Sequence, residues 1–209
     1  MARGLGLAAL LVAAAAGSAH ARNPHCSGGI LYVTQGMRDK DKGDRESYER
    51  QIRKAVFELQ QCATEDPADA EALGYLAWAY AEVDSAGPSG RAFAGAIAGL
   101  TAKGDKKKAD WAVGNRNSYW ARSFNDGIEH IRVAQQAYAE FTKPPADESE
   151  TTLKGEAEKH YREAIADLTR SSLFKPGDPQ TIRNLGSVYA FMGEYENAEA
   201  MFKEGLKAA

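Results

Sequence analysis

Histidine is the residue in this sequence whose metal chemistry is most easily recognised from spacing. Beyond the first 21 residues the histidines are His25, His130 and His160. None lies one helical turn from another and no His-Glu-x-x-His sequence is present, so the usual pattern of a zinc enzyme is missing. We therefore expect ordinary polar histidines and no metal site.

Two glycine-containing stretches superficially resemble catalytic or nucleotide-binding loops. The sequence "GPSG" around Ser89 lacks the spacing of a nucleophile elbow and is expected to be a turn. In "GLTAKGDK" (Gly99–Lys106) an Asp intrudes before the Lys and no Ser or Thr follows it, so this stretch is expected to be a helix end and a loop. We predict no catalytic residue, no enzyme activity and no cofactor.

Lysine and aromatic residues are interleaved in "KKKADWAVGNRNSYW", from Lys106 to Trp120. This composition suits stacking on bases or sugars. The chain, however, has 26 Lys and Arg against 29 Asp and Glu, and its formal net charge of −3 argues against a phosphate-binding surface. We favour core aromatics beside a solvated loop and expect no nucleic-acid partner.

The first residues have the pattern of a secretory signal peptide. Arg3 precedes the apolar run Leu5–Ala16, and Ala19-His20-Ala21 is a small-x-small sequence of the kind that signal peptidase accepts. As a helix the run would span only about 18 Å, too short for a bilayer core of about 30 Å. We expect cleavage near Ala21, a periplasmic or secreted protein, and no membrane span in the remaining chain.

Cys26 and Cys62 are the only cysteines. In an exported protein such a pair is expected to form a disulfide, with two free thiols as the alternative. The bridge would stabilise the fold by roughly 4 kcal/mol in the chain-entropy model.

Small and aromatic residues recur at helical spacing near the C-terminus. They fall on one face of two successive helices separated by Gly193: Ile182, Leu185, Gly186 and Tyr189, then Tyr195, Ala198, Phe202 and Leu206. Gly186 and Ala198 are expected at the crossing of the two helices.

Pro67 and Pro176 close two earlier segments, and each predicts the register of the helix pair that follows it. The residues at the matching repeat positions are Ala55, Leu59 and Cys62; Leu73, Leu76, Ala77, Tyr80, Phe93, Ala96 and Ile97, counted from Ala70; and Tyr161, Ala164, Leu168, Ser171 and Phe174.

This recurring pattern resembles the tetratricopeptide repeat (TPR), a helix–turn–helix unit of about 34 residues. Gly205 departs from it, because the family usually has Ala there. The resemblance implies an all-α fold, a short right-handed α-solenoid, over residues 46–209. Repeats are expected near 46–67, 70–103 and 179–209, with an elongated irregular pair at 117–176. Residues 22–45 are expected to be irregular, with a short helix held by Cys26 and then a charged loop.

The repeat phase is lost between Gly104 and Ser149. "GDKKKAD" is expected to be a polar connection, and two long helices are expected, one over Ser118–Phe141 and one from near Thr152 to Pro176, separated by the prolines of "TKPPADESE". The apolar stripe of the first long helix comprises Trp120, Phe124, Ile128, Ile131, Ala134, Tyr138 and Phe141.

Stacked repeats leave a concave groove that suits an extended segment or a helix of another protein. The resemblance therefore implies a non-enzymatic protein-binding scaffold whose partner is a protein or peptide. Arg183 and Asn184 form part of the residue set with which some family members grip a terminal carboxylate. The groove positions implied by the resemblance are Glu71, Trp78, Glu82, Gln180, Arg183, Asn184, Ser187 and Phe191.

Two other classes of protein remain open at this stage. One is a cell-envelope enzyme or sugar-binding protein on a helical scaffold, which would need a cleft with converging carboxylates or stacked aromatics. The other is a self-assembling structural protein. On the last helix Ala198 and Phe202 should point inward, whereas Met201 and Leu206 lean toward the flank where a next helix would lie. This flank is expected to dock on another subunit or a partner, with two singly exposed apolar residues as the alternative.

Overall fold

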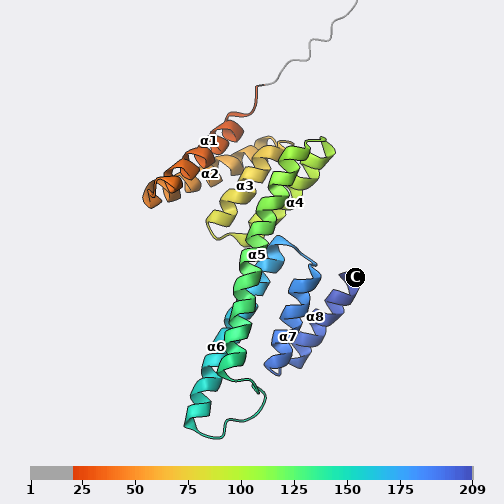
Figure 1. Cartoon of the computed structure of the whole chain (residues 1–209). Coiled ribbons are helices and arrows are strands. Elements are labelled where there is room, and N and C mark those ends of the chain that lie inside the picture. The colour runs from red at the N-terminus through yellow and green to blue at the C-terminus, as the bar shows by residue number, and fades with distance from the viewer. Residues whose placement is uncertain (1–20, 209) are drawn as a thin grey trace, which may run out of the picture.

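The computed structural model describes residues 21–208, and within that range it contains eight α-helices and no strand (Figure 1). The predicted signal peptide lies outside the described residues, except for Ala21. The helices are α1 (Pro24–Asp41), α2 (Arg45–Glu65), α3 (Ala70–Glu82), α4 (Ala86–Ala102), α5 (Lys106–Ala137), α6 (Glu148–Phe174), α7 (Pro179–Phe191) and α8 (Tyr195–Ala208). None of these helices is long and apolar enough to span a membrane.

Successive helices pack as four hairpins, α1–α2, α3–α4, α5–α6 and α7–α8, and the hairpins stack along the chain. Figure 1 shows the long α5–α6 hairpin between the α3–α4 and α7–α8 hairpins, with its loop at the end away from α3–α4. This is the all-α, TPR-like solenoid expected from the sequence. Both proline-anchored registers are confirmed, because α3 begins at Ala70 and α7 at Pro179.

Aspartate caps determine where most of the helices begin. An aspartate carboxylate accepts a hydrogen bond from the backbone N–H three residues further on, which satisfies one of the free donors at a helix start. This arrangement precedes α2, α3, α5, α6 and α7, with Asp44, Asp69, Asp105, Asp147 and Asp178 as the caps.

The buried side chains form two clusters that α5 connects. One cluster fills the space between α1, α2, α3, α4 and the first half of α5. The other lies between the second half of α5, α6 and α7. The positions predicted around Pro176 belong to the cores as expected, since Tyr161, Ala164, Leu168, Ser171 and Phe174 are all buried. The seven stripe residues of the first long helix are likewise buried or half-buried.

The N-terminal segment differs from the irregular structure expected for residues 22–45. It forms α1, an 18-residue helix that packs along α2, so the unit expected at 46–67 is only the second helix of a hairpin. Glycines, which weaken helices in isolation, here permit a close helix crossing: a Cβ at Gly36 would lie 2.8 Å from Ile52 Cδ1. Close packing therefore overrides the low intrinsic propensity.

The boundaries of the irregular region were also predicted incorrectly. Of "GDKKKAD" only Gly104 and Asp105 lie in the connection, because α5 already begins at Lys106, and α5 ends at Ala137 rather than at Phe141. Phe141 lies in the connection to α6, where it packs edge-on against Tyr161 with ring centroids 5.4 Å apart. "GPSG" is the first turn of α4, and Ser89 is a buried residue whose Oγ donates to the Ala77 carbonyl at 2.7 Å.

The last helix is more exposed than expected. Ala198 is buried and the Phe202 ring lies against Gly186 of α7, as expected, but that ring stays 42% exposed, and Tyr195 and Leu206 are 66% and 79% exposed. Among the described helices α8 makes close backbone contact with α7 alone, so its other flank lacks a covering helix.

Candidate protein-binding surface

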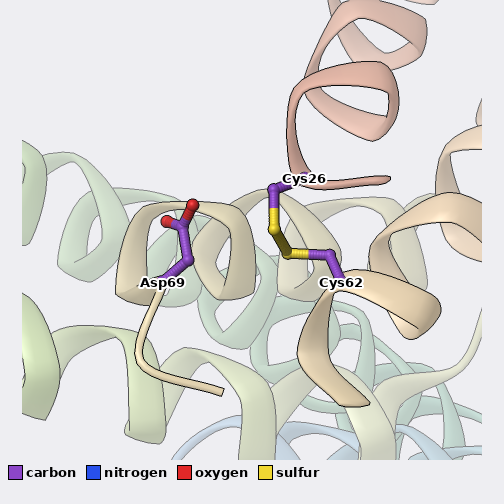
Figure 2. A group of neighbouring side chains, drawn as sticks. All are labelled: Cys26, Cys62 and Asp69. Atoms are coloured by element: carbon purple, nitrogen blue, oxygen red, sulfur yellow. A yellow bond between two sulfur atoms is a disulfide. The ribbon is translucent and has the colours of Figure 1, made fainter. Parts of the chain in front are cut away.

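The start of α3 is tied to α1 and α2 by covalent and polar links. Cys26 on α1 and Cys62 on α2 form the predicted disulfide (Figure 2). Asp69 lies beside it in Figure 2, caps α3, and accepts a hydrogen bond from Arg22 Nε at 2.7 Å. Because the two sulfur atoms are bonded to each other, they offer no thiolate to a metal.

Glu71 lies one residue inside α3 and takes part in a charged cluster. Its carboxylate lies 3.3 Å from Arg22 Nη2 and 3.2 Å from Lys108 Nζ, so it links the N-terminal residues to α5. These contacts are half-exposed, and the side chain can still face a ligand. Of the three α3 positions predicted to face the groove, Glu71 is therefore available, whereas Trp78 is only 6% exposed and belongs to the core.

Glu82, at the end of α3, is held by three donors. Tyr48 Oη, Tyr119 Oη at 2.5 Å and Lys40 Nζ at 3.1 Å all donate to its carboxylate. Burial by itself raises the pKa of Glu82, but the hydrogen bonds from Tyr119, Tyr48 and Lys40 outweigh it and hold the pKa below its usual value. Burial and the Glu82 carboxylate raise the pKa of both tyrosines, which therefore stay neutral donors.

A half-open cavity of about 540 Å³ adjoins Glu82 where α1, α2 and α3 meet. Its charged lining consists of three cations and two carboxylates: Lys40, Arg45, Arg53, Glu49 and Glu82. Glu82 is already fully engaged by its donors, and Arg45 pairs with Glu49 at 2.9 Å. The charges of this cavity are thus largely satisfied within the chain.

A smaller pocket, which we call the α3–α5 pocket, lies at the other end of α3. Its volume is about 250 Å³ and its lining is Glu71, Tyr75, Leu100, Lys107, Lys108 and Trp111. The Tyr75 and Trp111 rings are 4.9 Å apart and inclined at 40°. Trp111 can approach this closely because Gly74 has no side chain: a Cβ there would lie 3.2 Å from Trp111 Cζ3.

The interleaved lysine and aromatic residues noted in the sequence therefore contribute to a pocket with Glu71. The sequence supplied Trp111, Lys107 and Lys108, but it could not show that Tyr75, on another helix, lies opposite them. The spacing of residues within one helix gives no information about pairs of side chains on two different helices.

On α7 the predicted groove residues form an exposed strip that is separated from α3 by α5. Gln180 and Arg183 are exposed, while Asn184 and Ser187 are half-buried and their side chains donate to backbone carbonyls of their own helix. Phe191 is 41% exposed, with its ring centroid 6.2 Å from that of Tyr161. Arg183 makes no ion pair with another described residue and can meet a carboxylate, but Asn184 is engaged by the Gln180 carbonyl.

The fold and this surface define an all-α helical repeat protein of TPR-like architecture. No family model and no curated protein matches the sequence. Solved structures of MamA align with most of the chain. One titled "Crystal structure of MamA protein" is 16% identical, covers 87% of this chain and 92% of its own, and has a TM-score of 0.25.

Two further alignments are similar in extent. "MamA MSR-1 C2" is 16% identical and covers 86% of this chain and 95% of its own at a TM-score of 0.30. "MamA 41-end from Desulfovibrio magneticus RS-1" is 15% identical and covers 90% and 97% at a TM-score of 0.24. These values are too low to support an inference, so the description of the fold rests on the helix pairs themselves.

Proposed function

We propose that the protein is a non-enzymatic scaffold of the periplasm or extracellular space that binds an extended segment or helix of another protein. The observation that carries this proposal is the α3–α5 pocket. It is the right shape to receive one large apolar or aromatic side chain of a partner, because two rings and Leu100 form its walls.

The charges around the pocket suit the polar rim of an interface. Lys107 is exposed, and Lys108 and Glu71 are half-exposed. An apolar anchor surrounded by polar groups is the usual arrangement of an energetically important contact. The aromatic side chains are also rigid, so little conformational entropy is lost when a partner binds.

Export is supported by the leader sequence and by the disulfide, since disulfides form and persist mainly in oxidising compartments.

Site-specific photo-crosslinking tests the proposed surface. A photo-reactive residue in place of Lys107, at the rim, should capture one discrete partner in the native cell envelope. The same residue in place of Phe57, which is 59% exposed on α2 and outside the pocket, should not. Tyr75→Ala should abolish the Lys107 cross-link while leaving the helical circular dichroism unchanged. Equal capture from both positions would contradict the assignment.

We also propose that the exposed flank of α8 associates with a second copy of the chain. Leu206 places apolar surface there, and part of the Phe202 ring, which packs against Gly186 of α7, stays exposed beside it.

A further inference from the structure

Two histidines from different helices meet on the seam of the long α5–α6 hairpin. His130 Nδ1, on α5, lies 3.1 Å from His160 Nδ1, on α6. Glu163, one turn after His160, places Oε2 3.2 Å from His130 Nδ1 and 3.1 Å from His160 Nδ1. The three ligand atoms therefore form a nearly equilateral triangle.

Hydrogen bonds cannot satisfy all three sides of this triangle. If both Nδ1 atoms carry protons, both donate to Glu163 but then face each other as two donors at 3.1 Å. If one Nδ1 is deprotonated, it can accept from the other, but it then faces the carboxylate oxygen as a second acceptor. A cation that receives a lone pair from each of the three atoms removes this conflict.

The size of the triangle fits one face of a tetrahedral zinc site. Ligands about 2.0–2.1 Å from Zn²⁺ lie about 3.3–3.4 Å from one another in a tetrahedron. We propose that His130 Nδ1, His160 Nδ1 and Glu163 Oε2 bind one Zn²⁺ ion, with the fourth position open to water. Two imidazoles and one carboxylate favour zinc over Mg²⁺ or Ca²⁺, which prefer oxygen ligands.

The surroundings support a site that an ion can enter. The three side chains are 31%, 29% and 38% exposed, so solvent reaches them. Asp167 Oδ2 lies 3.7 Å from the other ring nitrogen of His130, and a small movement would bring it to hydrogen-bond distance, from which a carboxylate orients a metal-binding imidazole. Lys159 Nζ is 4.0 Å from Glu163, but this lysine is 73% exposed and can turn into solvent.

Calorimetric titration of the full, untagged protein with ZnCl₂ tests the site. Thiol reductants are omitted, which keeps Cys26 and Cys62 bridged and outside the measurement. We expect one ion per chain. His160→Ala should weaken binding at least about 100-fold and Glu163→Gln at least about 10-fold, while Asp167→Asn, an outer position, should cost about 10-fold.

His25→Ala is the matched control, because His25 lies on α1 and contacts Glu58 and Glu65 instead. It should bind Zn²⁺ like the parent protein, and MgCl₂ should not compete. Should His160→Ala fold poorly by circular dichroism, His160→Gln replaces it. Unchanged affinity in the folded His160 variant, or no binding by the parent protein at about 1 mM Zn²⁺, would overturn the proposal.

Discussion

Gly90 lies where α4 packs closely against the end of α6. A Cβ at this position of α4 would overlap the carbonyl oxygen of Leu173 and would lie 2.8 Å from its carbonyl carbon. Backbone at the end of α6 cannot turn aside as a side chain can. Gly186 has a softer neighbour, because a Cβ there would meet the Phe202 ring at 2.6 Å, and that ring is 42% exposed.

Gly90→Ala should therefore lower the free energy of unfolding by about 1–3 kcal/mol or more through overpacking. Gly186→Leu should cost less, since Phe202 can rotate into solvent. Gly114→Ala is the control: it lies inside α5 with open space around it, and alanine should stabilise the helix there by about 0.5–1 kcal/mol. Urea unfolding of the three variants provides the comparison, and equal stabilities for Gly90→Ala and Gly114→Ala would contradict the α4–α6 contact.

Glu82 should make the stability depend on pH. Its pKa is lowered by folding from an ordinary value of 4.5, so the ionised form stabilises the fold above about pH 4.5, and this contribution is lost as the pH falls through the folded pKa. Glu82→Gln should reduce stability at pH 7 by about 1–3 kcal/mol and make the loss of stability below pH 4.5 less steep. Chemical unfolding at pH 7 and at pH 3.5 measures both effects. Glu46→Gln, whose side chain is 92% exposed on α2, should change neither.

At the scale of elements, prolines and periodic apolar residues sufficed to predict α3, α6 and α7. Their registers were predictable because each helix buries one face, which fixes the spacing of apolar residues. The same reasoning missed α1, because its glycines favour a helix only through the close contact that they allow with Leu59 and Ile52 on α2. It also missed the start of α5, where a capped and solvated first turn needs no apolar residue.

The candidate site was harder to predict than the helices, because it depends on contacts between different helices. Glu71 and Glu82 were recognised as positions on one face of α3, but burial of Trp78 depends on neighbouring helices. The Tyr75–Trp111 and His130–His160 pairs each join two helices, and periodicity within one helix carries no information about such pairs.

The disulfide should account for much of the stability of the first hairpin. Cys26 and Cys62 are 36 residues apart, and closing a loop of that length restricts the unfolded chain by roughly 4 kcal/mol in the entropy model. Cys26→Ser with Cys62→Ser should lower the unfolding free energy by about 2–5 kcal/mol. Unfolding of the parent protein with and without reductant is the companion measurement, and reductant should not affect the double variant. Two alkylatable thiols in the unreduced parent would contradict the bridge.

At the scale of the whole molecule, α5 joins the two core clusters, and the contact between α4 and α6 adds to this connection. Helix α5 contacts α3 and α4 through its first half and packs on α6 along most of its length, and it also touches α7. The α3–α5 pocket and the proposed zinc site are therefore both built on this helix. The first and last described helices differ: α1 is linked to α2 by a disulfide, whereas α8 makes close backbone contact with α7 alone among the described helices.

The exposed end of the solenoid leads to the last prediction. Leu206 is 79% exposed, and with Phe202 it offers a small apolar surface compared with the 1,200 Å² or so that a specific stable interface buries, so we expect weak association.

Size-exclusion chromatography with light scattering, over a range of protein concentrations, should show a reversible dimer that Leu206→Glu converts to monomer. Lys207→Glu is the control, because it changes the net charge more than Leu206→Glu does and lies at the adjacent exposed position. It should leave the dimer intact if apolar contact holds the two copies together. Met201 is unsuitable for this test, because it is partly buried against the second core cluster and its substitution would also destabilise the fold. A parent protein that stays monomeric at every concentration would show that this flank of α8 does not mediate self-association.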